Sequence, residues 1–321
     1  MHTITLEEHF STPDLLRAIA DTTSGGPPDE ALTAKLLDLD HGRIADMDSG
    51  AVDMQVLSLA SAGFETLASA HANSIVTDAN DRATDAISKH PRRFAAFANV
   101  NLKDPRRACK ELDRCINKLG FKGAIVHGTT GGNFLDDDRF LPFWEASHAL
   151  GVPVYLHPAP PPAVVYDTYY TGLPGDCGRT LSINAWGWHT ETGLHTLRLI
   201  LSGLFDRFPS QQIIIGHMGE GLPYNLARAA GALAPVAKHL ERSISDYFHD
   251  NFHVTTSGYF TNPPFECAMK VVGLDRLLYA IDYPFSPVTK GEAFLDKLNL
   301  TPAERDKFVS GNAKDLLKLP R

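Results

Sequence analysis

The 321-residue sequence has few cysteines and no long apolar run. Its four cysteines (Cys109, Cys115, Cys177 and Cys267) include no C-x-x-C pair, so we expect free thiols rather than a disulfide framework. No segment approaches the roughly 20 apolar residues of a membrane span. The first residues also lack a basic stretch followed by an apolar one. We therefore expect no signal peptide and a cytoplasmic protein.

Basic runs and nucleotide-binding motifs are lacking too. Lys and Arg total 30 against 38 Asp and Glu, which gives a net charge of −8. Nucleic acid and anionic membranes are therefore not expected partners. No G-x-G-x-x-G or G-x-x-x-x-G-K-[ST] follows the first predicted strand, which disfavours an open doubly wound nucleotide-binding sheet. Histidine is abundant instead, with 14 residues, so position must select the functional ones.

Eight short apolar segments read as strands. They are TITLEEHF (3–10), DMQVLSLA (53–60), FAAFANVN (94–101), GAIVHG (123–128), PVYLHP (153–158), IIIGHM (213–218), FHVTTSG (252–258) and LLYAIDYPF (277–285). Several are continuously apolar, as expected of parallel strands covered on both faces. The alternating segments predict helices, most clearly at 104–120, where Asp104 is a good N-cap, Pro105 suits the first turn and Gly120 ends the pattern.

Eight strands alternating with helices predict one α/β domain over 1–321, a (β/α)8 barrel. Two connections are too long for simple turns, at about 11–45 and 159–190. Long connections inside compact domains are usually functional or disordered. We expect both to cover the active site. The second is rich in Tyr and Trp, which predicts a lid or pocket wall. A structural cover or a subunit contact is the alternative.

Polar residues gather at the predicted strand ends. Glu7 and His9 end the first strand, His157 the fifth, His217 the sixth and Asp282 the eighth. Chemistry in a barrel of this kind sits where the strands end. Residues i and i+2 of a strand share one face, so Glu7 and His9 are expected to face the barrel interior while Glu8 points outward.

This constellation predicts one divalent metal ion held by Glu7, His9, His157 and Asp282, because a cation would neutralise carboxylates that are costly to bury. Two nitrogens and two carboxylate oxygens suit Zn²⁺, Mn²⁺ or Fe²⁺. Each residue alone has an ordinary interpretation. His157 could be a hydrogen-bonded polar residue, Asp282 a turn residue before Tyr-Pro, and Glu7 the partner of an arginine.

The segment GHMGEGLPYNLAR (216–228) supplies further candidates. His217 and Glu220 lie three residues apart at a strand-to-helix turn, where a carboxylate can orient an imidazole and raise its basicity. We expect this pair to act in acid–base chemistry or substrate binding, with a helix-start hydrogen bond as the alternative. Arg228 could bind a substrate carboxylate or form a surface or interface ion pair.

The chain resembles the metal-dependent decarboxylases of the amidohydrolase superfamily, especially the γ-resorcylate (2,6-dihydroxybenzoate) and 2,3-dihydroxybenzoate decarboxylases. The matching stretches run in family order across nearly the whole chain: LEEHF, FKGAIVHG, YLHP, LRLILSGLFDRFP, IIIGHMGEGLPY, NFHVTTSG and IDYPF. Most hydrolytic relatives begin with His-x-His. The Glu-x-His of this chain resembles the decarboxylase branch.

The resemblance implies a distorted (β/α)8 barrel with one Zn²⁺, Mn²⁺ or Mg²⁺ on Glu7, His9, His157 and Asp282, no organic cofactor, and a homodimer or homotetramer. It implies that His217 and Glu220 act beside the metal and that Arg228 contributes to the substrate site. His127 stands where γ-resorcylate enzymes tend to have Asn. That position lines the pocket in the family, so the accepted ring substituents are expected to differ.

The implied reaction is the non-oxidative decarboxylation of an ortho-hydroxybenzoic acid to a phenol and CO₂, reversible at high bicarbonate. Asp282 would deliver the proton to the ring carbon, with His217 and Glu220 assisting. One alternative is a hydrolase in which a metal-activated water attacks a lactone or amide. Another is a decarboxylase or hydratase of a muconate-type acid.

Overall fold

The computed structural model describes residues 2–19, 29–60, 64 and 67–320. The strands are β1 (Ile4–Phe10), β2 (Met54–Leu59), β3 (Phe94–Ala96), β4 (Ala98–Asn99), β5 (Ala124–His127), β6 (Val154–His157), β7 (Ile213–Ile215), β8 (Phe252–Thr255) and β9 (Leu277–Leu278). Each lies inside one of the eight predicted segments. The third predicted segment is interrupted at Phe97 and forms both β3 and β4.

The helices in the first half of the chain are α1 (Pro13–Ile19), α2 (Glu30–Leu37), α3 (His41–Ser49), α4 (Ser69–Lys89), α5 (Pro105–Asn117), α6 (Leu141–Leu150) and α7 (Ala163–Tyr169). Those that follow are α8 (Cys177–Ser182), α9 (Gly187–Leu201), α10 (Leu204–Arg207), α11 (His217–Glu220), α12 (Leu222–Leu233), α13 (Ile244–Asn251), α14 (Asn262–Val272), α15 (Val288–Leu295), α16 (Pro302–Asp306) and α17 (Asn312–Leu317). Short 3₁₀ turns occupy Asp138–Phe140 and Leu274–Arg276, and a π-turn occupies Lys307–Gly311.

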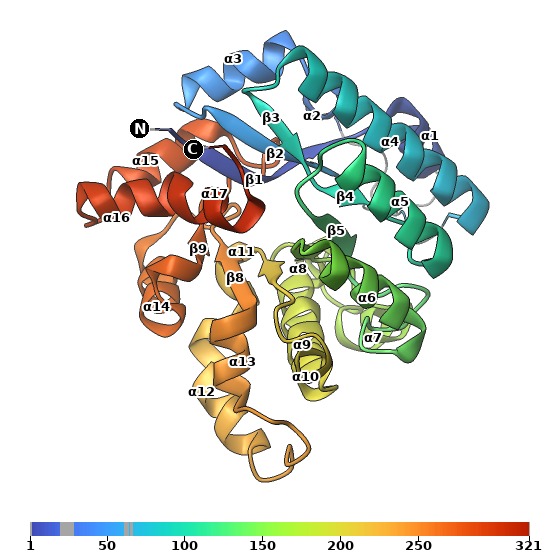
Figure 1. Cartoon of the computed structure of the whole chain (residues 1–321), viewed down its shortest axis with the longest axis vertical. Coiled ribbons are helices and arrows are strands. Elements are labelled where there is room, and N and C mark those ends of the chain that lie inside the picture. Colours follow the sequence, from blue (N-terminus) through green and yellow to red (C-terminus); the bar gives the residue numbers. More distant parts are fainter. Residues whose placement is uncertain (1, 20–28, 61–63, 65–66, 321) are drawn as a thin grey trace.

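All described strand pairs are parallel and follow chain order, in two runs, β1-β2-β3 and β4 through β9. The runs are joined because Phe97 continues from β3 into β4. At the other edge, a bridge between Leu6 and Ala280 connects β1 to the chain after β9. Figure 1 shows the helices arranged around this sheet, with α12 and α13 projecting from one side. The predicted (β/α)8 architecture is confirmed.

Side chains fill both sides of the sheet. One buried cluster takes alternate residues from the strands, such as Leu6, Val56, Ile125 and Ile214, and fills the barrel interior. A larger cluster packs the opposite strand faces against the helices. Burying side chains of this size stabilises the fold by about 1.5–3 kcal/mol each. Both layers are apolar, which explains why the strands read as continuous apolar runs.

Side chains cap the first turns of two helices, and the first of these caps was predicted. Asp104 caps α5 by accepting from the Arg107 N–H at 3.2 Å. Thr301 and Glu304 form a capping box at the start of α16. Gly203, whose φ of 76° suits glycine, separates α9 from α10.

The two long connections contain helices rather than extended loop. α1, α2 and part of α3 lie within 11–45, where residues 20–28 fall outside the described part of the chain. α7, α8 and the start of α9 lie within 159–190.

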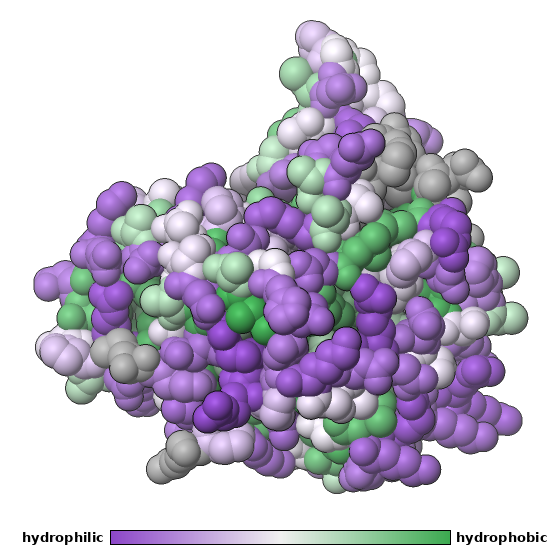
Figure 2. Space-filling model, turned by 90° about the horizontal axis from the view of Figure 1, so that it is seen from above, coloured by the Kyte–Doolittle hydropathy of each residue, from purple (hydrophilic) through white to green (hydrophobic). Residues whose placement is uncertain are grey.

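Within the described ranges, no helix combines the length and the apolar character that a membrane crossing requires. The surface in Figure 2 is mainly hydrophilic with interspersed apolar patches.

Candidate active site

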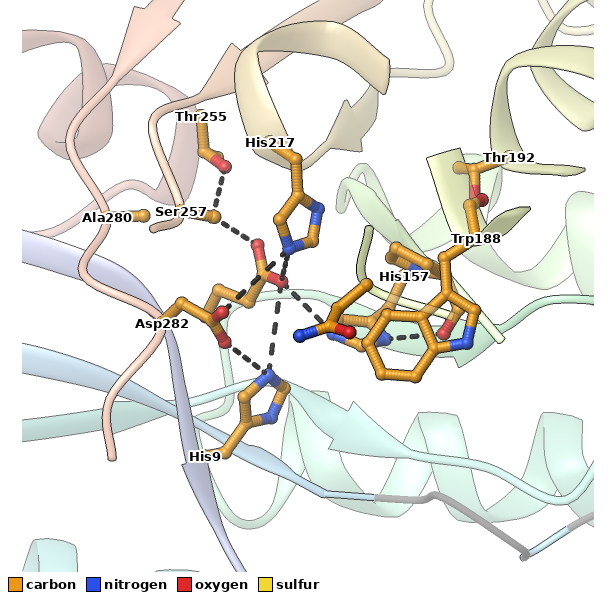
Figure 3. Close-up of polar contacts among 12 residues, drawn as sticks. His9, His157, Trp188, Thr192, His217, Thr255, Ser257, Ala280 and Asp282 are labelled. Carbon is orange, nitrogen blue, oxygen red and sulfur yellow. Dashed lines mark hydrogen bonds and ion pairs between the residues drawn. The ribbon is translucent and has the colours of Figure 1, made fainter. Parts of the chain in front are cut away.

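The predicted metal-binding residues converge at the carboxyl ends of the strands. Glu7 Oε1 lies 3.1 Å from His157 Nε2, 3.6 Å from His217 Nε2 and 3.9 Å from His9 Nε2. Asp282 closes the group, with Oδ1 3.4 Å from His9 Nε2 and Oδ2 3.9 Å from His217 Nε2. Figure 3 shows the side chains of His9, His157, His217 and Asp282 pointing toward one another. Residues 275 positions apart in the chain thus share one centre because parallel strands end at the same edge.

A bulge in β1 directs Glu7 into the barrel. The pairing with β2 shifts between Thr5 and Glu8, and Glu7 has a φ of 61°. Strict alternation would place Leu6 and Glu7 on opposite faces, but the extra residue lets both face the interior. Glu7 and His9 face inward, as predicted. Glu8 faces the other way and is fully buried there instead of reaching solvent.

Hydroxyl groups orient the Glu7 carboxylate. Tyr155 Oη and Ser257 Oγ both donate to Glu7 Oε2, and Thr255 Oγ1 lies 2.9 Å from the same tyrosine oxygen. Gly216 permits the close approach, because a Cβ there would lie 2.9 Å from Oε2. Burial by itself raises the pKa of Glu7. The imidazoles of His217, His157 and His9 together outweigh burial and lower this pKa to about 2. Glu7 is therefore ionised, and its Oε1 faces the imidazoles.

The histidine rings are turned so that their Nε2 atoms face the centre. His157 Nδ1 donates to the Pro158 carbonyl at 2.7 Å, and His9 Nδ1 lies 3.1 Å from Ser58 Oγ. Burial lowers the pKa of His9, so its ring is neutral and can offer a lone pair. Holding Nδ1 in this way is how proteins orient metal-binding histidines.

A divalent cation fits this donor set. Among the described residues, Glu7 Oε1 and His9 Nε2 are buried without a hydrogen-bond partner. Ligand atoms of Glu7, His9 and His157 lie within 4.8 Å of one another, and so do those of Glu7, His217 and Asp282. Buried polar atoms without partners are costly unless something else satisfies them. Two carboxylates and neutral imidazoles are suitable ligands for Mn²⁺ or Zn²⁺.

Glu220 bridges two imidazoles, one of which the sequence did not single out. His217 Nδ1 donates to Glu220 Oε1 at 2.8 Å, and His189 Nδ1 lies 2.5 Å from Glu220 Oε2. His189 Nε2 donates to the Asn184 carbonyl at 3.1 Å, which fixes the orientation of this ring beside Glu220. His189 has no strand-end position. Its only sequence signal was a place in the aromatic connection at 159–190.

Charge on the neighbouring groups holds a proton on His217. Burial lowers the pKa of His217, but Glu220, Glu7 and Asp282 together raise it to about 10. Burial likewise raises the pKa of Glu220, while the imidazoles bring it below its usual value. His217 is therefore a cation beside the cluster in the absence of metal, with Nε2 directed at the centre.

Left-handed backbone conformations position His217 and Glu220. The predicted strand ends at Ile215, and His217, Met218 and Glu220 all have positive φ. Such conformations are unfavourable for non-glycine residues and concentrate at functional sites. The tight turn brings His217 and Glu220 to the centre together, which a continuing strand would not do.

Two predicted substrate-binding residues have different positions. His127 lies beside His157, with ring centroids 4.7 Å apart, and burial places its pKa well below the usual value. Its Nε2 is buried without a partner among the described residues. Arg228 is exposed on α12, and no contact joins it to the cluster within the described part of the chain. The structure thus brings His127 to the site but not Arg228.

Comparison with known proteins identifies the class. The model of the amidohydrolase family matches residues 10–319, and the chain belongs to this family. Among its relatives, γ-resorcylate decarboxylase of Polaromonas sp. is 37% identical, with 99% of each chain covered.

Two solved structures support the same branch. The dihydroxybenzoic acid decarboxylase of Polaromonas sp., with bound manganese and the inhibitor 2-nitroresorcinol, is 36% identical, with a TM-score of 0.89 over 100% of this chain and 98% of that one. The 5-carboxyvanillate decarboxylase of Novosphingobium aromaticivorans, with manganese and 4-hydroxy-3-methoxy-5-nitrobenzoic acid, is 34% identical, with a TM-score of 0.91 over 99% and 96%. The resemblance seen in the sequence is confirmed, and the hydrolase and muconate-type alternatives are not favoured.

Proposed function

We propose that this protein is a metal-dependent decarboxylase that converts an ortho-hydroxybenzoic acid to a phenol and CO₂. The observation that carries the proposal is the convergence of Glu7, His9, His157 and Asp282, with buried Oε1 and Nε2 atoms that lack partners among the described residues. Relatives of nearly the same length, at 34–37% identity, are named as decarboxylases of hydroxybenzoates or of a related phenolic acid.

Glu7, His9, His157 and Asp282 would hold one divalent ion, and Mn²⁺ is the first choice because it is bound in the related structures. When bound, the ion supplies positive charge to the substrate's carboxylate and ortho oxygen. Zn²⁺ and Mg²⁺ are the other candidates. No organic cofactor is required, because the reaction exchanges CO₂ for a proton without a redox change.

Asp282 is the proposed proton donor. Its side chain is 19% exposed, against 0% for Glu7 and 1% for His9, so it is the carboxylate of the cluster that faces the open side. It would deliver a proton to the ring carbon that bears the carboxylate. The bond from that carbon to the carboxylate then breaks, its electron pair returns to the ring, and CO₂ leaves. General acid catalysis of this kind contributes about 10²–10⁴-fold.

His217 would stabilise the charge that develops on the substrate. Its ring is held by Glu220, which His189 holds in turn, so little reorganisation is needed during the reaction. The ortho oxygen of the substrate is needed because it donates electron density to the ring when C1 takes the proton, and so stabilises the intermediate in which aromaticity is lost.

His127 would contact the substituents of the substrate ring. Arg228, which is exposed on α12, would bind the substrate carboxylate of an adjoining subunit. The His127 Nε2 atom, buried and neutral, can accept a hydrogen bond from a second ring hydroxyl. A 2,3- or 2,6-dihydroxybenzoate satisfies this requirement.

We also propose a homodimer or homotetramer in the cytoplasm. Exposed apolar side chains gather on the 159–190 connection and on α12, including Tyr169, Trp186 and Tyr224 at 72%, 61% and 84% exposure. Large exposed aromatic residues are typical of protein contacts. This would give the 159–190 connection a role as subunit contact as well as pocket wall.

The experiment is to incubate metal-loaded protein with 2,3- and 2,6-dihydroxybenzoate and to measure catechol, resorcinol and CO₂. Running the reaction in D₂O should place deuterium at the former carboxyl carbon. Turnover of lactones without CO₂ release, or product without deuterium, would contradict the proposal.

A further inference from the structure

The barrel seam between β1 and the chain after β9 has little backbone pairing. Its only bridge joins Leu6 to Ala280 in the described residues. Beyond it, the Leu6 N–H donates to Tyr279 O at 3.1 Å and the His9 N–H donates to Tyr283 O at 2.6 Å. The proposed ligands lie on opposite sides of this seam. Their separation therefore depends on what holds the two segments together.

Glu8 fills the gap in the seam. Its Oε1 accepts from the Ile281 N–H at 2.9 Å, and its Oε2 accepts from the Tyr283 N–H at 3.3 Å. These two amides flank Asp282, which has a φ of 66°. The carboxylate thus takes the place of a missing strand partner and fixes the backbone on both sides of Asp282.

A buried network returns from Glu8 to β1. Gln55 Nε2 donates to Glu8 Oε2 at 3.3 Å, and Arg43 Nε donates to Gln55 Oε1 at 2.7 Å. Arg43 Nη1 donates to the His9 carbonyl at 2.9 Å, and its guanidinium lies 4.6 Å from the centre of the Tyr283 ring. Glu8, Gln55 and Arg43 are all fully buried. The network therefore links His9, on one side of the seam, to the residues that flank Asp282 on the other side.

We propose that Glu8 is a positioning residue that sets the distance between Asp282 and the Glu7–His9 pair, and with it the affinity of the site for a divalent ion. The inference rests on the proposed metal site but not on the proposed reaction. An amide at this position could not replace the carboxylate, because its NH₂ group would face at least one N–H donor in either orientation. Mutation of a residue that holds a metal ligand in place typically changes metal affinity or activity by about 10–100-fold.

The test compares Glu8→Gln with Glu111→Gln. Glu111 is also a carboxylate with little exposure and accepts from Asn80 and Arg114, but it lies outside the seam. Each chain is stripped with a chelator, its thermal unfolding is recorded, and its Mn²⁺ affinity is measured by calorimetry well below the unfolding temperature. We expect Glu8→Gln to bind Mn²⁺ about 10–100-fold more weakly, while Glu111→Gln binds within 2-fold of the native chain.

A purely structural role would lower the unfolding temperature of both variants without changing the Mn²⁺ affinity of the folded protein. Affinity of Glu8→Gln within 2-fold of the native value would overturn the proposal. If Glu8→Gln does not fold, Glu8→Asp replaces it. Its shorter carboxylate cannot reach both amides, so at least a 3-fold loss is expected, and unchanged affinity would again overturn the proposal. Mn²⁺ binding by a native chain that decarboxylates no hydroxybenzoate would refute the proposed function alone.

Discussion

Replacing Asp282 with asparagine separates proton delivery from metal binding. The backbone at Asp282 is left-handed, with φ 66°, a conformation that asparagine tolerates well. Alanine would add backbone strain and confuse the result. The group formed by Glu7, His9 and His157 does not include Asp282, so three ligands remain for the metal.

The expected loss in kcat follows from the assigned role. An amide cannot supply the proton, so kcat should fall by about 10²–10⁴-fold, which corresponds to roughly 2.7–5.5 kcal/mol in the activation free energy. The assay is CO₂ release at an Mn²⁺ concentration that gives one ion per chain, verified by elemental analysis. Weaker metal binding is thereby kept apart from slower chemistry.

Asp136→Asn is the matched control. Asp136 is 15% exposed, close to the 19% of Asp282, and pairs with Arg198 away from the cluster. It should retain full turnover. If Asp282→Asn with one Mn²⁺ per chain turns over within 10-fold of the native enzyme, Asp282 is not the proton donor and the proposed mechanism is wrong.

Three further predictions test other parts of the structure. Chelation should abolish CO₂ release, and added Mn²⁺ should restore it and raise the unfolding temperature in a concentration-dependent way, because the ion binds the folded chain; activity that survives complete metal removal would contradict the site. Glu220→Gln should lower kcat by about 10²-fold at unchanged Mn²⁺ content, since a neutral amide removes the negative charge that raises the pKa of His217. A change in Mn²⁺ content alone would instead assign Glu220 to the metal. Burial lowers the pKa of His195 to about 3, below an unfolded value of about 6.5, so protons favour the unfolded chain and stability falls as the pH drops below about 6.5. Metal-free native protein should lose about 2 kcal/mol more than His195→Gln between pH 7 and pH 5 in urea unfolding, because glutamine keeps an acceptor for the Leu135 N–H without titrating; equal losses would contradict the assignment.

The sequence by itself determined the order of strands and helices and the choice of the four proposed metal ligands. Continuous apolar runs of strand length predict buried parallel strands, and parallel strands in a barrel end on one side. Polar residues at those ends must therefore be neighbours, which is why Glu7, His9, His157 and Asp282 could be grouped without coordinates.

Tertiary structure decided what depends on backbone irregularity and on contacts between distant segments. The bulge in β1 and the left-handed turn at His217 carry no simple periodic signal, yet they direct Glu7 and the His217–Glu220 pair into the site. His189 joins Glu220 only because α9 packs beside that turn. Strand alternation predicted that Glu8 points away from the barrel interior. Alternation gives the face on which a side chain lies, but it does not say which other segments cover that face. In the folded chain it is buried against the amides that flank Asp282.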